Sequence, residues 1–424
     1  MKESILHYVW QYKLFLHDRL QTTDGDTVEI IDTGKLNTDA GPDFFNAKVR
    51  INNILWAGNI EIHTHSSDWN KHRHQTDKAY ANVILHVVNI VDTDIFNADG
   101  EKIPQLALRY PDYITHNYEQ LLAGQKWIAC ADKIQTIPVV IIESWKQALL
   151  IERLQQKTAA IAQLQNTNLQ HWEESFYVTL ARSFGFGVNS QIFESLAKSL
   201  PLQVLGKHKD SLHEIEALLF GQSGLLINDN SDQYTVDLWR TYDFLRKKYN
   251  LHPVNGTQWK MLRLRPDNFP YIRIAQFAAL IYSSSKLFSK IIENPDLANL
   301  RTLFSCEPSA YWQTHYVFGR ESTEKTKRLG TRTIDVLLIN TIVPFLFLYG
   351  EQKQQQHYKD KALELLEKLP PEKNAIIDNW TKLGLTSSSA YDTQALLQLK
   401  KMYCDDKKCL RCRVGHKIVE RKVV

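Results

Sequence analysis

Acidic and imidazole side chains gather in the first part of the chain, at spacings that could hold a metal ion. Asp43 follows a glycine and a proline, while Glu61 and His63 alternate along an apolar segment, where a strand would place them on one face. Two converging carboxylates are the ligands that Mg²⁺ or Mn²⁺ prefers, and such an ion activates a bound water. We therefore expect Asp43 and Glu61 to hold a divalent cation and His63 to assist water. The alternative is that Asp43 is only a turn residue and Glu61 a solvated strand position.

Further histidines follow in the same region. His65 falls on the same predicted strand face as Glu61. His72 and His74 are two residues apart in a segment that we expect to be a helix, so at most one of them should face the site. His86 lies inside an apolar strand, where a hydrogen-bonded core histidine is the commoner arrangement. Imidazoles from the strand and the following helix would suit Zn²⁺ or Mn²⁺.

A second candidate site lies near the C-terminus, with the spacing Cys-x4-Cys-x2-Cys-x3-His. Four soft or borderline ligands so close together suit a tetrahedral Zn²⁺, which can order a segment that lacks a core of its own. We expect this zinc knuckle to use Cys404, Cys409, Cys412 and His416. An iron–sulfur cluster with Cys130 as the fourth ligand is an alternative, although the histidine favours zinc. Unrelated free thiols are the remaining alternative.

Basic side chains near these sites could contact phosphates. The candidates for nucleic-acid contacts are Lys48, His65, His72, Arg411 and Arg413. A separate segment, residues 259–276, interleaves arginines with aromatic rings, and it could also grip a phosphate backbone. We expect Arg263 and Arg265 instead to form a buried lock with a carboxylate of Glu194, Glu214 or Glu216.

The acidic site requires a sheet, and the sequence predicts one. Alternating apolar and polar residues rich in β-branched side chains predict strands at 27–36, 43–51, 54–63 and 82–91. Asn52-Asn53 suits a tight turn between the second and third strands. A short helix is expected over 66–81, an amphipathic helix at the N-terminus, and an edge strand near 106–113. The order is helix, three strands, helix, strand.

The sequence pattern changes after Pro138, where apolar residues recur with helical periodicity over long segments. The sequence therefore predicts an α+β protein in three parts: an α/β domain over 1–135, a mostly α-helical domain over 136–400, and the knuckle over 401–424. A length of 424 residues suits several domains.

Composition favours a cytoplasmic protein. The chain is 43% hydrophobic, with a net charge of +4 that permits a nucleic-acid partner without requiring one. No secretory signal is expected at the N-terminus, and five cysteines in this arrangement do not suggest disulfides. The most apolar run, 334–349, is shorter than the ~20 residues of a membrane span and contains polar residues, so we expect a buried core helix and no membrane association.

The N-terminal part resembles the PD-(D/E)XK nuclease superfamily. The predicted order αβββαβ matches the core of that superfamily, Pro42-Asp43 matches its PD step, and Glu61-Ile62-His63 stands at its (D/E)XK step. The resemblance implies metal-dependent cleavage of nucleic acid. His63 replaces the lysine of that family. Lys48 could substitute, but strand parity places it opposite Asp43 unless a bulge intervenes.

The whole chain also resembles an uncharacterised bacterial family, domain-of-unknown-function family 2851, found mainly in Bacteroidetes. The segments that carry this resemblance are GKLNTDAGPDFFNAKVRI, GNIEIHTHSSDWNKHRHQTDKAYANVILHVV, IEALLFGQSGLL, LRLRPDNFPYIRIAQFA and CLRCRVGH. That family implies no established activity, so functional hypotheses depend on the residues.

Three hypotheses follow from these residues. The first is a metal-dependent nuclease or phosphodiesterase, with Asp43 and Glu61 on Mg²⁺ or Mn²⁺. The second is a catalytically inactive nucleic-acid-binding or assembly protein, which the histidine in place of lysine favours. The third is a Zn- or Mn-dependent hydrolase of a small molecule. Three histidines on one metal would favour the third, and an acidic pair beside a basic groove would favour the first.

Overall fold

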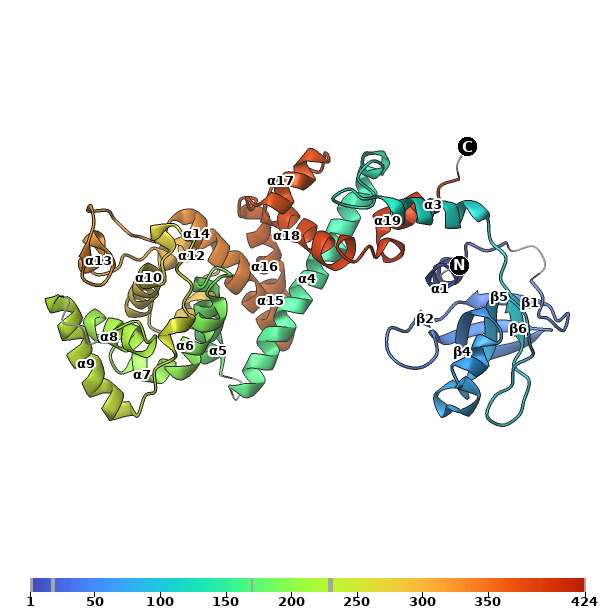
Figure 1. Cartoon of the computed structure of the whole chain (residues 1–424), viewed down its shortest axis with the longest axis horizontal. Coiled ribbons are helices and arrows are strands. Elements are labelled where there is room, and N and C mark those ends of the chain that lie inside the picture. The colour runs from blue at the N-terminus through green and yellow to red at the C-terminus, as the bar shows by residue number, and fades with distance from the viewer. Residues whose placement is uncertain (1–2, 17–19, 169–170, 228–231, 423–424) are drawn as a thin grey trace. The chain divides into compact units, whose positions relative to one another are not determined.

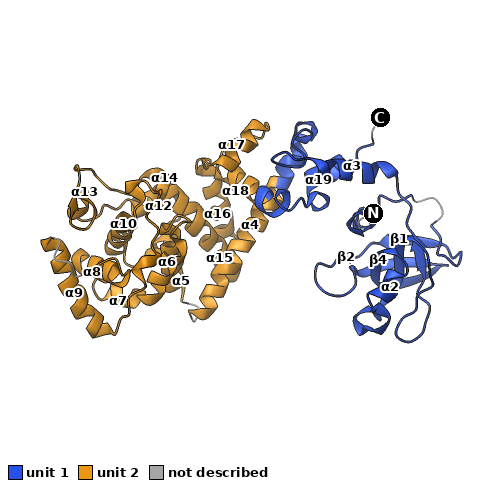
Figure 2. Cartoon of the chain, viewed as in Figure 1, with its two compact units in different colours: residues 1–145, 399–424 blue, residues 146–398 orange. Residues whose placement is uncertain are grey.

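The protein consists of two compact units, one of which is discontinuous in sequence. The computed structural model describes residues 3–16, 20–168, 171–227 and 232–422. Unit 1 comprises residues 1–145 and 399–424, and unit 2 comprises residues 146–398 (Figure 2). Unit 1 contains the large sheet, whereas unit 2 is mostly helical (Figure 1). The predicted α+β class is confirmed.

The sheet of unit 1 is mixed. Its strands are β1 (Val28–Asp32), β2 (Lys35–Leu36), β3 (Phe44–Ile51), β4 (Ile54–His65), β5 (Val83–Ile90) and β6 (Gln105–Ala107). They lie in the order β1-β3-β4-β5-β6, with β2 beside β3. The pairs β1–β3 and β3–β4 are antiparallel, whereas β4–β5 and β5–β6 are parallel. The carboxyl ends of β4 and β5 therefore meet at one edge of the sheet.

The local sequence explains most of this sheet. Phe44, Val49 and Ile51 of β3 are buried, as a strand with one face on a core requires. Asn52 and Asn53 both have positive φ, 45° and 68°, which gives the tight turn expected between β3 and β4. The expected helix over 66–81 is shorter than predicted. It is a single turn, α2 (Asp68–Lys71), followed by two 3₁₀ turns.

The C-terminal segment belongs to unit 1. It contains a π-helical turn (Lys400–Cys404), a 3₁₀ turn (Cys409–Arg411) and α19 (Arg413–Val419). The Tyr8 hydroxyl, on α1 (Glu3–Gln11), lies 2.7 Å from Nδ1 of His416. The amide of Asn117, on α3 (Asp112–Ala123), donates to the carbonyl oxygens of Val419 and Arg421 at 3.2 and 2.9 Å. These contacts hold the end of the chain against helices from its beginning.

Unit 2 consists mainly of helices, formed by segments whose apolar residues recur with helical periodicity. It also contains a two-stranded hairpin, β7 (His315–Val317) and β8 (Arg320–Glu321). The long helix α4 (Val139–Thr167) begins in unit 1 and continues into unit 2. The helices that follow it are α5 (Trp172–Phe184), α6 (Ser190–Ser199), α7 (Leu202–Gly206), α8 (Leu212–Gln222), α9 (Gln233–Tyr249), α10 (Pro270–Ser283), α11 (Leu287–Glu293), α12 (Leu297–Phe304), α13 (Tyr311–Thr314), α14 (Thr331–Leu337), α15 (Val343–Gln352), α16 (Gln356–Lys368), α17 (Ala375–Lys382) and α18 (Ala390–Leu399).

The most apolar run lies in the core of unit 2. Among the described residues, Thr331–Gln352 is one helix long and apolar enough to cross a membrane by length and composition alone, with a mean hydropathy of 1.7 over its best window. However, 78% of that window is buried inside the protein. A core helix of a folded domain passes the same test of length and composition, and the burial agrees with the core helix expected from sequence.

The prediction that Arg263 and Arg265 form buried ion pairs is wrong. Arg263 and Arg265 are exposed, because the chain around them forms a surface turn before α10. The buried arginine of this segment is Arg273, which donates to Gln276 at 2.8 Å and packs over the ring of Phe186. The three carboxylates proposed as partners bind other groups: Arg182 and Lys198 for Glu194, His208 for Glu214, and Tyr234 and Ser309 for Glu216.

A buried ion pair that sequence did not single out stabilises unit 2. Nζ of Lys146 lies 2.7 Å from Oδ1 of Asp392, whose other oxygen accepts from the amide and hydroxyl of Ser388 at 2.8 and 2.9 Å. Burial alone would raise the pKa of Asp392, but the hydrogen bonds from Lys146 and Ser388 outweigh burial and lower it.

Asp392→Asn is expected to lower the unfolding free energy at pH 7 by about 3 kcal/mol, because it removes the charge of one member of a buried ion pair. Since the pKa of Asp392 is lower in the folded than in the unfolded chain, this stabilisation is present above the unfolded pKa of ~4 and is lost as the pH falls through the lower folded pKa. Thermal denaturation across this range checks both statements. The exposed Glu324→Gln is the control, and equal melting temperatures of Asp392→Asn and wild type at pH 7 would contradict the prediction.

Candidate metal centre

Four potential ligand atoms converge at the end of β4. Oε1 of Glu61 lies 3.3 Å from Nε2 of His63 and 3.3 Å from Nε2 of His74, and Nε2 of His63 lies 3.1 Å from Nδ1 of His72. The ligand nitrogens of the three histidines all lie within 4.8 Å of one another. A tetrahedral ion with bonds of about 2.0–2.1 Å holds its donors roughly 3.3 Å apart. The three imidazole nitrogens therefore gather as the ligands of one transition-metal ion would, while Glu61 borders His63 and His74 but lies outside this group of three.

A left-handed residue brings His72 and His74 to the same place. The helix α2 ends at Lys71, and Arg73 has a φ of 63°. This turn reverses the chain between the two histidines, so both reach His63. The expectation that at most one of them could face the site is wrong, because it assumed that the helix continued through both residues.

Neighbouring side chains orient the ligands. Nδ1 of His63 lies 2.8 Å from Nε2 of the buried His86, which leaves Nε2 of His63 directed to the site. His86 is thus the hydrogen-bonded core histidine expected from sequence. Tyr80 stacks on the ring of His74, with centroids 3.8 Å apart, and Trp69 packs edge-on against it at 5.4 Å. Such outer contacts fix the tautomer and the ring plane of a metal ligand.

The electrostatics of the site favour a cation. Burial lowers the pKa of His63 to about 4 and that of His86 to about 3, so both imidazoles are neutral at pH 7, as metal ligands must be. Burial also raises the pKa of Glu61, which the neighbouring His74 only partly opposes. Nε2 of His74 is buried and lies 3.3 Å from Oε1 of Glu61, outside the geometry of a regular hydrogen bond. A bound cation would satisfy this nitrogen and neutralise the carboxylate. The donor set of three imidazoles and one carboxylate suits Zn²⁺ or Mn²⁺ better than Mg²⁺.

A second cluster adjoins the first and contains Asp43. The Oδ2 atom of Asp43 lies 3.2 Å from Nε2 of His7 and accepts from the amide of Ile62 at 2.9 Å, while His7 also lies 3.5 Å from Glu3. The amide of Asp43 donates to Oε2 of Glu61 at 3.1 Å. Glu61 therefore connects the two clusters. Its carboxylate and that of Asp43 are neighbours, but they face different imidazoles.

His7 is cationic at neutral pH. Burial alone would lower the pKa of this imidazole, but the carboxylates of Asp43 and Glu3, 3.2 and 3.5 Å from its Nε2, outweigh burial and raise the pKa to about 9. Sequence reasoning missed both His7 and Glu3. Their four-residue spacing on an amphipathic helix whose other face is buried was the available signal.

Two other predicted residues lie outside the cluster. His65 is half-exposed, with Nδ1 3.8 Å from Asp68. A bulge in β3 places Lys48 on the side of the sheet that Glu61 faces, but its partner on β4 is Ala57, four residues and thus about 13 Å from Glu61. Lys48 therefore does not take the place of the nuclease lysine beside Glu61.

The C-terminal histidine does not join the cysteines. Nδ1 of His416 lies against the hydroxyl of Tyr8, and its Nε2 lies 3.2 Å from Glu420. Both ring nitrogens of His416 thus have partners other than the cysteines of the expected Cys₃His knuckle, and Cys404, Cys409 and Cys412 lie in the same unit as Cys130. Of the two arginines predicted for phosphate contact, Arg411 is exposed, while Arg413 donates to Ser144 and packs over the ring of Trp145.

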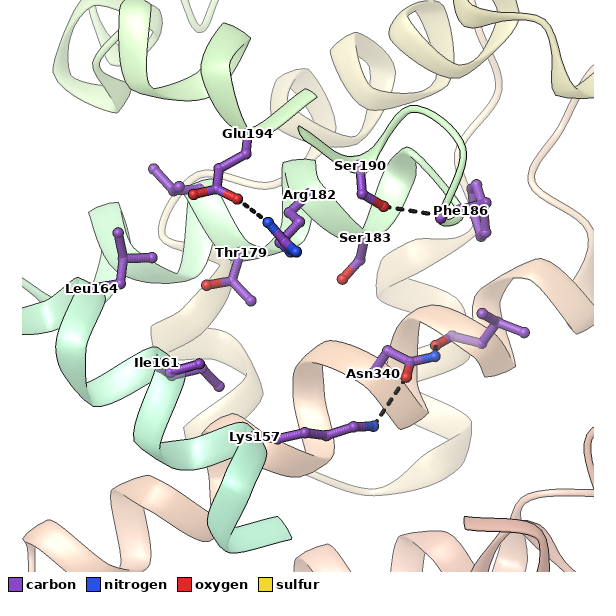
Figure 3. A pocket seen from close by; sticks show the side chains of 14 residues that line it. Lys157, Ile161, Leu164, Thr179, Arg182, Ser183, Phe186, Ser190, Glu194 and Asn340 are labelled. Carbon is purple, nitrogen blue, oxygen red and sulfur yellow. Dashed lines mark hydrogen bonds and ion pairs between the residues drawn. The ribbon is translucent and has the colours of Figure 1, made fainter. Parts of the chain in front are cut away.

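Unit 2 contains a cavity of about 640 Å³ between α4, α5, α6 and the helix that begins at α14 (Figure 3). Its charged groups bind one another or nearby amides: Arg182 pairs with Glu194, and Lys157 donates to Asn340 at 3.0 Å. Neither of the metal-ligand clusters among the described residues lies here. The cavity could bind an apolar molecule, but its side chains suit catalysis less than those of unit 1 do.

Comparisons with known proteins identify a family but no activity. Neither curated proteins nor solved structures give a match. Residues 3–375 match the family described as protein of unknown function DUF2851, and this match covers both the histidine cluster and the greater part of unit 2. The chain therefore belongs to the DUF2851 family.

Proposed function

We propose that this protein is a metal-dependent hydrolase of phosphate diesters, with nucleic acid as its substrate. The observation that supports this most directly is the gathering of three imidazole nitrogens within 4.8 Å of one another, with Glu61 3.3 Å from two of them. Zn²⁺ or Mn²⁺ bound there would lower the pKa of a water and polarise a phosphoryl oxygen. Of the four ligands, only His72 is exposed, so substrate would approach from its side.

The second cluster supplies a proton donor. His7 carries a proton at neutral pH and forms an ion pair with Asp43. The carboxylate of Asp43 is itself positioned by a hydrogen bond from the amide of Ile62. An imidazolium so placed is suited to protonate a leaving oxygen. Glu61 borders the histidine cluster and also accepts from the amide of Asp43. This double contact would couple the position of the ion to that of the proton donor.

Three histidines on one ion are the arrangement expected of a hydrolase of a small molecule, but two other features favour nucleic acid as the substrate. Pro42-Asp43 lies just before β3 and Glu61-Ile62-His63 within β4, in an antiparallel meander followed by a crossover to a parallel strand, an order in keeping with the resemblance to PD-(D/E)XK nucleases. In addition, Arg73 and Lys78 are exposed in the loop that carries His72 and His74, where they would meet phosphates. We propose a cytoplasmic location, in keeping with such a substrate.

A catalytically inactive protein that binds nucleic acid is the second candidate. Its support is that Glu61, His63 and His74 are buried, because a closed shell of four protein ligands is typical of structural metal sites. In that case the ion would stabilise the fold around β4 and take no part in hydrolysis.

The test is hydrolysis by protein stripped with a chelator and reloaded separately with Zn²⁺, Mn²⁺ or Mg²⁺. Substrates would be single- and double-stranded DNA, RNA and bis(p-nitrophenyl) phosphate. We expect cleavage of a nucleic acid only after loading, best with Zn²⁺ or Mn²⁺, and a loss of at least about 100-fold in His74→Ala. His65→Ala, a neighbouring histidine outside the cluster, is the matched control.

Two outcomes would contradict the proposal. Protein that binds the ion through the histidine cluster but cleaves none of these substrates would favour the inactive candidate. Cleavage of the small diester alone would favour the hydrolase of a small molecule.

A further inference from the structure

A basic cavity of about 660 Å³ lies in unit 1, where the C-terminal segment returns to the chain before α4. Its walls come from α3, from the 3₁₀ turn Ile134–Thr136 with the residues on either side, and from α19 with the residues that follow it. The charged side chains that line it are Lys133, Lys417, Glu420, Arg421 and Lys422. Four cations and one carboxylate give this lining a formal charge of +3.

The single carboxylate of the lining is already engaged. Oε1 of Glu420 accepts from Nζ of Lys417 at 2.6 Å, and Oε2 of Glu420 lies 3.2 Å from Nε2 of His416. The ion pair with Lys417 cancels one of the four positive charges. The other three cations must therefore account for the positive charge of the cavity.

Those three cations contact neutral groups or solvent. Nζ of Lys133 donates to the side-chain oxygen of Gln120 at 3.2 Å. Nη1 of Arg421 donates to the hydroxyl of Thr136 at 3.5 Å, and Lys422 is exposed. In the part of the chain that the structure describes, no ion pair involves any of the three. A cavity lined by charges of one sign concentrates its electric field, so it attracts anions.

Long-range contacts of the fold bring these cations together. The buried amide of Asn117 donates to the carbonyl oxygens of Val419 and Arg421, 304 positions away from Arg421 in sequence. This contact fixes the backbone just after α19. On the opposite wall, the contact with Gln120 of α3 holds the ammonium of Lys133. The positive charge therefore comes from segments that only the tertiary structure brings together.

An apolar surface borders the cavity. Ile137 and Ile418 form part of its lining, and Pro138 leads from it into α4. The next two residues, Val139 and Val140, are 71% and 72% exposed. Unpaired bases have apolar faces, whose burial against such side chains is favourable. In a duplex these faces are covered by neighbouring bases, so the surface suits a single strand.

We propose that this cavity binds the backbone phosphates of single-stranded nucleic acid. Each backbone phosphate carries one negative charge, so three successive phosphates match the charge of the lining. A single phosphate monoester carries at most about two negative charges and would leave it positive. The choice of nucleic acid rests on the proposed function, and the cavity belongs to the same unit as the histidine cluster. The residues that bind the strand are separate from that cluster.

The experiment is binding of a short, fluorescently labelled single-stranded DNA or RNA to the full chain, measured by anisotropy at several salt concentrations. A chelator keeps the protein free of metal, so that no cleavage disturbs the measurement. The double variant Lys133→Gln/Arg421→Gln should bind at least about 10-fold more weakly at 0.1 M salt, and the slope of log K against log[salt] should fall by about 0.7 per cation removed. The double variant Lys353→Gln/Lys382→Gln, which removes the same charge from exposed positions of unit 2, should bind as wild type does.

Wild-type protein gives an independent measurement. Acetylation of Lys133 and Lys422 should slow when the strand is bound, whereas acetylation of Lys353 should not change. Unchanged acetylation of Lys133 and Lys422 in the saturated complex would overturn the proposal, whatever the stability of the variants.

Several outcomes of the binding experiment would also overturn it. These are equal affinity of Lys133→Gln/Arg421→Gln and wild type, no binding of any strand by wild type, and tighter binding of duplex than of single strand. Binding to vesicles of anionic lipid but to no strand would assign the surface to a membrane instead. The proposed hydrolysis fails separately: if wild type binds the strand through this cavity but cleaves nothing after metal loading, the cavity is still assigned and the hydrolase is not.

Discussion

Glu61→Gln is expected to reduce the metal affinity of the histidine cluster by at least about 100-fold and to reduce hydrolysis with it. The glutamate is the only anionic ligand of the set, and its Oε1 lies 3.3 Å from both His63 and His74. Its other oxygen accepts from the amide of Asp43, so the substitution also weakens the link to the proton donor. No other single change should affect the ion and the acidic pair together.

The stability of the same variant gives a second readout. Without metal, Glu61→Gln should unfold at the same temperature as wild type or higher, because a buried carboxylate without a counter-cation is costly. With the ion at 100 times its dissociation constant, wild type should gain about 2.7 kcal/mol, and the variant almost nothing. Calorimetric titration and thermal melts measure both effects. Glu29→Gln, an exposed strand glutamate of the same sheet, is the control. Equal metal-induced stabilisation of Glu61→Gln and wild type would contradict the assignment.

Gly415→Ala should disrupt the cysteine segment. An added Cβ at Gly415 would lie 2.0 Å from the carbonyl oxygen of Cys409 and 2.8 Å from its carbonyl carbon, and a backbone obstacle cannot rotate away. The 3₁₀ turn that carries Cys409 must therefore move from α19. We expect a loss of about 3 kcal/mol in the unfolding free energy of unit 1, as overpacking against rigid groups produces.

Gly206→Ala is the matched control for this substitution. Gly206 is also helical, but no heavy atom lies within 4 Å of its added Cβ. Alanine there should be neutral or should stabilise by up to about 1 kcal/mol, through helix propensity alone. Differential scanning calorimetry of both variants checks the comparison. A Gly415→Ala variant as stable as wild type would show that the turn and the helix are not held as described.

The sequence predicted the sheet well, because its signals are local. The alternation in β3, β4 and β5 and the asparagine pair between β3 and β4 each act within a few residues. The proximity of Asp43 and Glu61 followed from the hairpin that joins their strands. Helical periodicity likewise identified most of unit 2. These patterns record which face of an element is buried, and burial is set by the residues of that element.

The remainder of the site depends on contacts that no local pattern records. His74 joins His72 only because Arg73 adopts a left-handed conformation in place of another helical turn. His7 reaches Asp43 from a helix at the start of the chain. The contacts of Lys407 with Leu122 and of Lys400 with Trp127 depend on the return of the C-terminal segment to unit 1. Spacing within one segment pointed to His416 as a ligand beside the cysteines, but its ring is directed elsewhere.

That return of the C-terminus has a consequence for synthesis of the protein. On the ribosome, the roughly 250 residues of unit 2 are translated after most of unit 1, which takes about 10 to 50 s at ordinary rates. Throughout this interval the faces of α1 and α3 that receive α19 lack their partner. A nascent chain is therefore expected to fold its middle first and to complete unit 1 only once the segment that contains α19 has been made. A premature stop codon anywhere in the second half of the message would yield a folded sheet with an uncovered surface, a substrate for chaperones and proteases.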